Sequence, residues 1–216
     1  IIPTIGVKTI FKDVRHINDG DLSQVDTVIH LAGISNDPVG TLTKGDVYDP
    51  TRHYTYRLAK LCKKLHIHFI FASSCSIYGV GQDKLLAEST KPNPQTGYST
   101  NKAEIEDDLR SLSDATFSPI ALRFATIFGM SPRIRFDVVI NMFVGMAVTK
   151  RAIILNSDGL SWRPHLHILD ACEAIRCAVE SNYCGAKLMI VNVGMDENNC
   201  QTITVARMIQ TLLPGT

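Results

Sequence analysis

The chain has 216 residues, a length that predicts one domain or one domain with a smaller addition. It is 45% hydrophobic and 20% charged, as in an ordinary soluble globular protein. The formal net charge of +1, from 22 basic and 21 acidic residues, gives no electrostatic reason to expect a nucleic acid or an acidic membrane surface as a partner. The apolar runs are far shorter than the roughly 18 residues of a membrane span, and the first residues lack a signal-like pattern, so we expect a cytoplasmic protein.

Cysteines and histidines carry no metal or disulfide signature. The six cysteines form no C-x-x-C pair and most lie in apolar runs, which favours reduced, buried thiols over a disulfide framework. His66 and His68 alternate at the start of a strand, and His165 and His167 do the same, without a cluster of cysteines or carboxylates nearby. We therefore expect no metal site.

Strands and helices alternate along the first part of the chain, which predicts an α/β fold with a mainly parallel sheet. The expected strands are Val7 to Val14, Asp26 to Leu31, His68 to Ala72 and Pro119 to Phe128. The expected helices are Tyr54 to Leu65 and Tyr98 to Leu112, and a polar, proline-bearing loop covers Gly79 to Gly97.

The pattern loosens after residue 130. Helices are expected at Phe136 to Val148, Ile168 to Val179 and Ile203 to Leu213, and strands at Ala152 to Leu155 and Leu188 to Val193. We expect residues 1–130 to form the sheet domain and residues 131–216 a smaller substrate-binding region, interleaved with late strands of the sheet. Truncation of this region at its C-terminus is an open alternative.

Tyr98 and Lys102 are four positions apart, which places them on one face of a helix. A lysine ammonium beside a phenol favours the phenolate form, which can take a proton from a hydroxyl and return it. The spacing alone is weak, because it is common on solvated helix faces. Ser74, at the carboxyl end of a predicted parallel strand, would point into the crevice where ligands bind and could hydrogen-bond the same substrate oxygen, or it could cap the strand end instead.

These features come in the order of a known active-site run. The strand-end serines, then Tyr78-Gly79, Asn93-Pro94 and Tyr98 to Lys102, resemble that of the extended short-chain dehydrogenases/reductases. Ile34 to Pro38 and Ser131 to Asp137 resemble the NAD-dependent nucleotide-sugar epimerase/dehydratase branch of this family. The resemblance runs from about Lys12 to about Ile209 and implies a Rossmann-like, doubly wound parallel sheet with NAD as the cofactor, NADP being the open alternative.

The resemblance also implies roles for individual residues. Ser74, Tyr98 and Lys102 match the catalytic positions. The cofactor positions are Asp13, Val14, Leu31, Ala32, Gly33, Ser35, Ala72, Ser73, Tyr98, Lys102 and Phe124. The positions expected to contact a nucleotide-diphosphate sugar are Ser74, Cys75, Ser76, Thr126, Arg133 and Arg163. Arg163 opens a run similar to the family's R-x-x-x-H-V-x-D, whose arginine grips the diphosphate; a solvated surface arginine is the alternative for Arg163 and Arg133.

Departures from the family narrow the activity. The 4,6-dehydratases carry an Asp-Glu pair directly after the strand-end hydroxyl, where this chain has Cys75 and Ser76. This difference disfavours dehydration and favours a 4-epimerase-like reaction, with a reductase or dehydrogenase as the alternative. Thr51 stands where the family often has an asparagine beside the cofactor, which weakens that contact.

A glycine-rich G-x-G-x-x-G turn is missing. Gly79 and Gly81 follow a strand, but no third glycine opens a helix. We therefore expect the chain to begin after the first βαβ unit, either as a piece of a longer enzyme, which we favour, or as a truncated, non-catalytic paralogue that binds a nucleotide sugar or a protein. The resemblance further implies a homodimer through the helices at residues 54–65 and 98–112, with packing on the sheet as the alternative.

Overall fold

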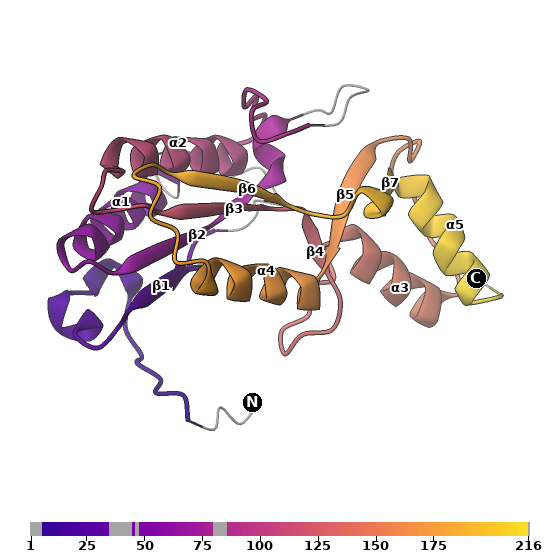
Figure 1. The fold of residues 1–216 in the computed structure, drawn as a ribbon. Coiled ribbons are helices and arrows are strands. Elements are labelled where there is room, and N and C mark those ends of the chain that lie inside the picture. Colours follow the sequence, from indigo (N-terminus) through magenta and orange to yellow (C-terminus); the bar gives the residue numbers. More distant parts are fainter. Residues whose placement is uncertain (1–5, 35–44, 46–47, 80–85, 216) are drawn as a thin grey trace. The chain divides into compact units, whose positions relative to one another are not determined.

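The computed structural model describes residues 6–34, 45, 48–79 and 86–215. Helices and strands alternate along the chain, as Figure 1 shows. The strands are β1 (Thr27–His30), β2 (His68–Ser74), β3 (Ile120–Phe124), β4 (Thr126–Phe128), β5 (Trp162–His167), β6 (Met189–Val193) and β7 (Asn199–Gln201). The helices are α1 (Asp49–Lys64), α2 (Gly97–Leu112), α3 (Val139–Lys150), α4 (Ile168–Glu180) and α5 (Thr202–Leu212).

The chain divides into two compact units, and each is described by itself. The first unit consists of Ile5–Arg123 and Ala174–Asn192, and the second contains Phe124–Glu173 and Val193–Thr216. The boundary predicted between residues 130 and 131 divides the chain by expected function, whereas these two units are defined by contacts within the chain. The functional boundary stays a prediction. In the described part of the chain, no helix is long and apolar enough to cross a membrane.

The first unit holds a sheet with the strand order β1-β2-β3-β6. β1 and β2 pair in parallel, with Thr27 opposite His68 and His30 opposite Phe71, and α1 connects them. In Figure 1, α1 and α2 lie on one side of the sheet, whereas α4, which belongs to this unit from Ala174 on, lies on the other. The predicted α/β class with a parallel, Rossmann-like sheet is confirmed.

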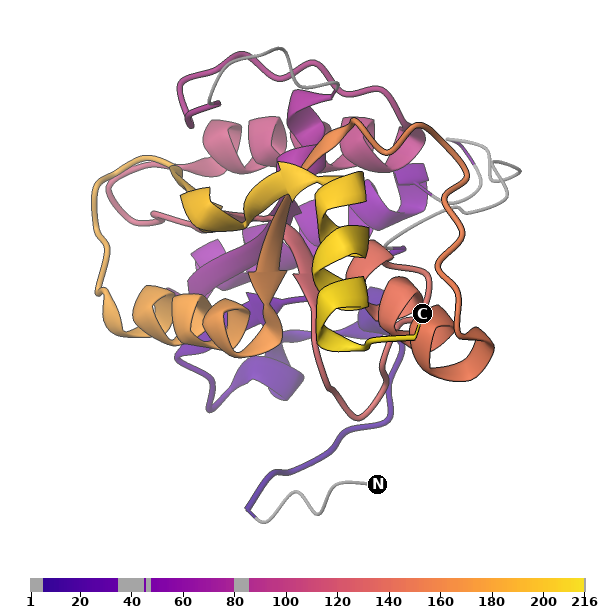
Figure 2. The ribbon, with the colours of Figure 1, turned by 90° about the vertical axis from the view of Figure 1, so that its right-hand side faces the viewer.

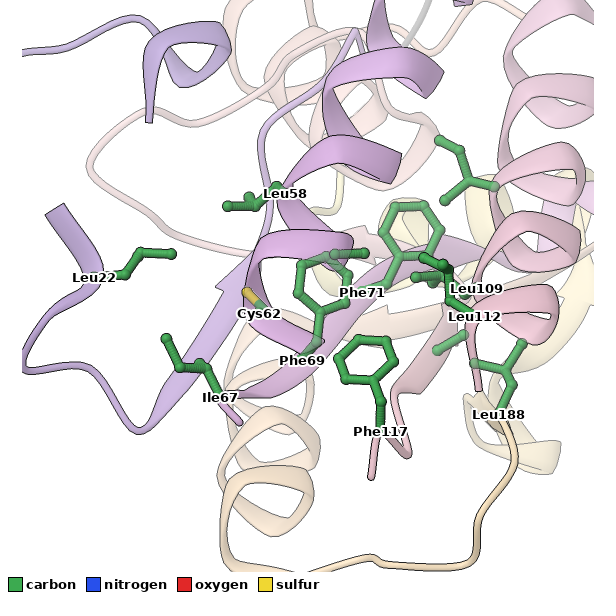
Figure 3. Close-up of a cluster of buried hydrophobic side chains, with 13 residues drawn as sticks. Leu22, Leu58, Cys62, Ile67, Phe69, Phe71, Leu109, Leu112, Phe117 and Leu188 are labelled. Atoms are coloured by element: carbon green, nitrogen blue, oxygen red, sulfur yellow. The ribbon is translucent and has the colours of Figure 1, made fainter. Parts of the chain in front are cut away.

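The core of the first unit lies between the sheet and the helices α1 and α2. Phe69 and Phe71 alternate along β2, so both side chains point to the same face, and both are at most 1% exposed. They pack with Leu58 of α1, Leu109 of α2 and other buried residues in a single cluster, drawn in Figure 3. Apolar contact therefore holds the two helices to β2 at Phe69 and Phe71.

Local sequence sets the start of each of these helices. α2 begins with a capping box, in which Thr96 Oγ1 accepts a hydrogen bond from the Ser99 amide at 3.1 Å and Ser99 Oγ accepts one from the Thr96 amide at 3.0 Å. The first turn of α1 contains Pro50, whose missing N–H would have no helical partner there. Both predicted helices are confirmed, and α1 begins five residues before Tyr54, at Asp49.

The second unit holds a three-stranded sheet with the order β4-β5-β7. β5 pairs with β4 in parallel and with β7 in antiparallel register. α5 lies alongside α3, as Figure 2 shows, and the buried Phe143 and Ala147 of α3 pack against Val205 and Ile209 of α5.

Three predicted strands differ in the structure. Val7 to Val14 was expected as a strand, but residues 7–13 form neither helix nor strand, because the described residues offer them no strand to pair with, and Val14 opens a 3₁₀ turn. Ala152 to Leu155 is also not a strand: Ile153 and Leu155 instead pack onto the α3 and α5 cluster. Pro119 to Phe128 splits into β3 and β4, which belong to different sheets.

The sequence patterns missed β7 and indicated β5 only through the alternation of His165 and His167. β5 contains Pro164, which argues against a strand interior, and β7 has only three residues. The two halves of β5 pair with different strands: Trp162 to Pro164 pair with β7, and His165 to His167 pair with β4. His165 and His167 do alternate within a strand, but they lie at its end rather than at its start.

We expect Phe69→Ala to lower the free energy of unfolding by about 3 to 5 kcal/mol, because it leaves a cavity in the packed cluster. Phe11→Ala is the matched control, since Phe11 is 98% exposed and Phe69 is 0% exposed. Urea unfolding followed by circular dichroism measures both. Equal losses in the two variants would contradict the core assigned here.

Candidate active site

The carboxyl ends of β1 and β2 lie side by side, because His30 is opposite Phe71 in the parallel register. The residues that follow β1 are Leu31, Ala32 and Gly33, and all three are exposed. At the end of β2, Ala72 and Ser74 are half-buried. The structure thus leaves open surface at the strand ends where a ligand of a parallel sheet binds.

Lys102 extends from α2 to this edge of the sheet. Its ammonium donates a hydrogen bond to the Ala72 carbonyl at 2.7 Å. It also lies 5.6 Å from the centroid of the Tyr98 ring and 4.6 Å from that of Phe71. Burial lowers the pKa of Lys102 to about 8, against the opposing attraction of Glu106. The structure therefore brings Tyr98 and Lys102 together, beside the strand that ends in Ser74.

Ser74 and Cys75 begin a 3₁₀ turn that follows β2. Ser74 Oγ accepts a hydrogen bond from the Ser76 amide at 3.2 Å, which is the capping role that the sequence left open. The accepted bond leaves the hydroxyl proton available for another group. Cys75 Sγ donates to the Arg123 carbonyl at 3.1 Å, and burial raises the pKa of this thiol to about 11. Ser76 is exposed.

A buried ion pair lies next to these residues, and sequence reasoning missed it. Arg123 of β3 and Glu106 of α2 are each 1% exposed, and two parallel bonds of 3.0 Å and 2.6 Å join them. Ser73 Oγ donates to the same carboxylate at 2.6 Å. The hydroxyl of Ser73, predicted to contact the cofactor, is thus already used. An arginine within the apolar strand Ile120–Phe124 and a glutamate one helical turn after Lys102 were the available signals.

His30 is a second buried polar residue that the sequence did not single out. It is 4% exposed, and its Nε2 lies 3.0 Å from Thr55 Oγ1. The Thr55 hydroxyl donates to the Thr51 carbonyl at 2.7 Å, so Nε2 carries the proton and Thr55 accepts it. Burial and the positive charge of Lys102 lower the pKa of His30 to about 4. His30 is therefore neutral at physiological pH.

Asp13 is an exposed carboxylate, as expected for a ligand contact, but Arg15 already binds it. Arg15 donates from its backbone amide at 2.8 Å and from its guanidinium at 2.6 to 3.1 Å. These bonds hold the pKa of Asp13 well below its usual range. Val14 is half-buried in the turn that Asp13 caps. Ser35 lies outside the described residues.

The remaining predicted residues belong to the second unit. Phe124 is buried at the end of β3, and Thr126, half-buried, pairs with His165 at the start of β4. Arg133 and Arg163 are both exposed, and Arg163 donates to the carbonyl of Trp162 at 3.4 Å. Within the described ranges, no group of three or more histidine, cysteine or acidic residues could hold a metal ion.

A parallel sheet with a tyrosine and a lysine held at the strand ends is the arrangement of the short-chain dehydrogenase/reductase class. A family comparison narrows this class: the model of the NAD dependent epimerase/dehydratase family matches residues 14–194. The chain belongs to this family.

Two proteins with similar sequences are described as an epimerase and a dehydratase. The chain is 29% identical over 160 residues to a Bacillus subtilis protein described as an uncharacterized UDP-glucose epimerase, YtcB, over 71% of this chain and 49% of that protein. It is 23% identical over 176 residues to human dTDP-D-glucose 4,6-dehydratase, over 81% of this chain and 49% of the human protein. The chain thus spans about half the length of these relatives.

Solved structures share the fold. MoeE5 in complex with UDP-glucose and NAD matches with a TM-score of 0.82 at 24% identity, over 94% of this chain and 68% of that one. The UDP-glucuronic acid 4-epimerase of Bacillus cereus in complex with NAD matches with a TM-score of 0.78 at 21% identity, over 93% of this chain and 64% of that one.

His30 predicts an acid-sensitive contribution to stability. Its folded pKa of about 4 lies below the ordinary value of 6.5, so the unfolded chain binds the proton more tightly. The free energy of unfolding therefore falls as the pH drops from about 6.5 to about 4. In His30→Gln this loss between pH 7 and pH 4 is smaller than in the wild type by on the order of 3 kcal/mol.

Urea unfolding at the two pH values measures the difference. His53→Gln, at an exposed position of α1, is the control and should keep the wild-type pH dependence. The assignment is wrong if His30→Gln and His53→Gln lose equal stability between the two pH values.

Proposed function

We propose that the complete protein is an NAD-dependent nucleotide-sugar epimerase. It oxidises one sugar carbon transiently and reduces it again from the opposite face, with Tyr98 as the acid/base and Lys102 and Ser74 as its partners. One observation carries the proposal: Lys102, bonded to the Ala72 carbonyl at 2.7 Å, lies at the Tyr98 ring and at the end of the strand that presents Ser74. The family and the fold support the NAD dependence.

The strand ends fit one face of a dinucleotide. Leu31 is 63% exposed, and Ala32 and Gly33 beside it leave the backbone accessible, with Ala72 at the neighbouring strand end. These residues would lie against the cofactor. The sequence contains no glycine-rich turn for the pyrophosphate, so we assign only this face. When bound, NAD supplies the hydride acceptor and, in the return step, the hydride donor.

The protein's own residues move the proton. Ser74 donates a hydrogen bond from its hydroxyl to the substrate oxygen and orients it, while the Tyr98 phenolate takes the proton of the substrate hydroxyl as the carbon loses its hydride. The Lys102 ammonium stabilises the phenolate by its positive charge. After the ketose turns, Tyr98 returns the same proton to the oxygen and the hydride returns to the other face. Atoms and electrons balance without any further reactant.

The turn after β2 supports epimerisation over dehydration. Loss of water needs an acid and a base in addition to Tyr98. The Cys75 thiol, with its pKa of about 11, keeps its proton at neutral pH and donates it in a hydrogen bond to the Arg123 carbonyl. Ser76 is no carboxylic acid either. Since a dehydrogenase would use the same three residues, net formation of reduced cofactor is the outcome that would identify one.

The second unit would supply the substrate contacts. Arg163 and Arg133 carry exposed guanidinium groups, which suit the oxygens of a diphosphate. Thr126 and Phe124, at the join of β3 and β4, are proposed to contact the sugar and the cofactor, respectively.

We expect Tyr98→Phe to lower kcat at least a hundredfold, because no other group at the strand ends is assigned the proton transfer. The chain contains a matched control. Tyr56 and Lys60 on α1 have the same spacing, and the Lys60 ammonium lies 5.5 Å from the Tyr56 ring centroid, compared with 5.6 Å for Lys102 and Tyr98. Tyr56→Phe should keep wild-type turnover.

The assay uses the complete gene product with a panel of UDP- and dTDP-hexoses, and follows sugar inversion by proton NMR. Undiminished turnover by Tyr98→Phe would refute the mechanism. A wild-type protein that inverts no sugar, yet binds one in calorimetry, would instead support the non-catalytic alternative.

The homodimer expected through residues 54–65 and 98–112 corresponds to α1 and α2. Within one chain these helices already contact each other, and Arg52 bridges them by binding Asp108 at 2.6 Å. The outward side of α1 remains exposed and basic, with Arg57, Lys60 and Lys64. We propose this side as the dimer surface.

Light scattering of the complete gene product should give twice the mass of one chain. Lys60→Glu, on the proposed surface, should change the monomer–dimer equilibrium, because it reverses a charge where two identical surfaces would meet. Lys187→Glu, at an exposed position outside α1 and α2, should leave the mass unchanged. A monomeric wild type would contradict the proposal.

A further inference from the structure

The ion pair between Arg123 and Glu106 is the most deeply buried charged group in the described part of the first unit. Both side chains are 2% exposed, and the shorter bond is 2.6 Å. Neither residue is among those assigned to substrate or cofactor. A buried ion pair adds little net stability, because the cost of desolvating two charges offsets their attraction. Stability alone is therefore a poor explanation for this pair.

Glu106 joins the helix of the proposed acid/base to the strand of the proposed hydroxyl. On α2 it lies four positions after Lys102, on the same helix face. Its carboxylate accepts the Ser73 hydroxyl at 2.6 Å, while Lys102 binds the carbonyl of the preceding residue, Ala72, at 2.7 Å. Two consecutive residues of β2, directly before Ser74, are thus anchored to consecutive turns of α2.

Arg123 joins the same site to the segment leading into α2. Its Nη1 donates to the Tyr78 hydroxyl at 2.7 Å and to the Glu88 carbonyl at 3.4 Å. The Tyr78 hydroxyl in turn donates to Asn192 Oδ1 at 2.7 Å. The backbone carbonyl of Arg123 holds Cys75, the residue after Ser74. One guanidinium therefore connects β3, β6, the turn after Ser74 and the loop before Tyr98.

Among the residues that the structure describes, few charges act on the Lys102 ammonium. His30 on β1 is neutral at physiological pH, since its pKa is about 4. Tyr98 and Glu106 share α2 with Lys102, and Arg123 on β3 reaches it only through Glu106. Glu106 is thus the negative charge that opposes the effect of burial on Lys102.

We propose that Glu106 and Arg123 are positioning residues for the reaction assigned above: the pair holds α2, β2 and the turn after β2 in register, so that Ser74, Tyr98 and Lys102 meet at one substrate oxygen with Lys102 charged. The proposal rests on the proposed function for its reaction, but its geometry is independent of turnover.

The test compares two acid-to-amide substitutions on α2. Glu106→Gln removes the buried charge. Asp108→Asn is the matched control, because Asp108 also accepts two bonds from one arginine, Arg52 at 2.6 and 2.7 Å, but outside the network of Lys102. The ammonium of Lys102 is titrated by carbon NMR on lysine labelled at Cε, with Lys102→Arg to assign the signal. Melting temperatures are recorded alongside.

Glu106→Gln should move the titration midpoint of Lys102 to lower pH, because the attraction that raised its pKa is gone. In the complete gene product it should lower kcat about tenfold to a hundredfold at unchanged KM, as expected when reacting groups are misplaced. The alkaline limb of the kcat profile should move with the midpoint. Asp108→Asn should change neither the midpoint nor kcat.

An unchanged Lys102 midpoint in Glu106→Gln, or equal effects of the two substitutions, would overturn the proposal. If Glu106→Gln does not fold, Tyr78→Phe replaces it, since it keeps both charges and removes one hydroxyl from Arg123. Loss of kcat without a shift of the Lys102 midpoint would then support the positioning role, and wild-type kcat would overturn it. A wild type without epimerase activity refutes the proposed function, whereas the Lys102 titration still decides this inference.

Discussion

The bond from the Lys102 ammonium to the Ala72 carbonyl is the constraint on which the site depends. A charge taken out of water costs several kcal/mol unless fixed dipoles and counter-charges replace the lost hydration. Here one carbonyl and the faces of Phe71 and Tyr98 replace it at close range. Glu106, one turn further along α2, adds the negative charge. The helix can therefore not slide along the strand without leaving a buried charge unsatisfied.

Two tyrosine–lysine pairs with the same spacing show why environment decides function. Tyr56 and Lys60 repeat the spacing of Tyr98 and Lys102, and their ring-to-ammonium distances of 5.5 Å and 5.6 Å are nearly equal. Lys60 is exposed on α1, where water screens its charge. Lys102 is held at a strand end with its pKa lowered to about 8. The Lys102 site combines a perturbed charge with exposed residues at the neighbouring strand ends.

The sequence predicted those parts of the fold that local patterns encode. The periodicity of α1 and α2 and the apolar runs of β1, β2 and β6 place these elements within a few residues, and the order of strand, serine, tyrosine and lysine predicts the proximity of Tyr98 and Lys102 that the structure contains. The predictions that were wrong concern strands whose pairing depends on residues distant in sequence. Residues 7–13 have the pattern of a strand, but none of the described strands pairs with them. Nothing local marks Ala125, where the chain passes from one sheet to another.

The site shows the same division. Ser74, Tyr98 and Lys102 lie in one recognisable run, whereas the Arg123–Glu106 pair joins residues 17 positions apart and reaches across three elements to Asn192. The periodicity of apolar residues does not reveal a buried charge whose partner comes close only in the folded state. An arginine inside an apolar strand was the clearer of the two visible signs, because such a residue is buried only when it is paired.

The same network limits the chemistry that the site can perform. The Arg123 carbonyl accepts a hydrogen bond from the Cys75 thiol. Burial raises the pKa of this thiol to about 11, so it keeps its proton at neutral pH. A thiol in this state neither delivers a proton to a leaving hydroxyl nor removes one from carbon at neutral pH. In the proposed mechanism, proton transfer at the end of β2 is therefore assigned to Tyr98 alone. A single acid/base suffices for oxidation and return at one carbon, whereas elimination of water requires a second group that this turn does not provide.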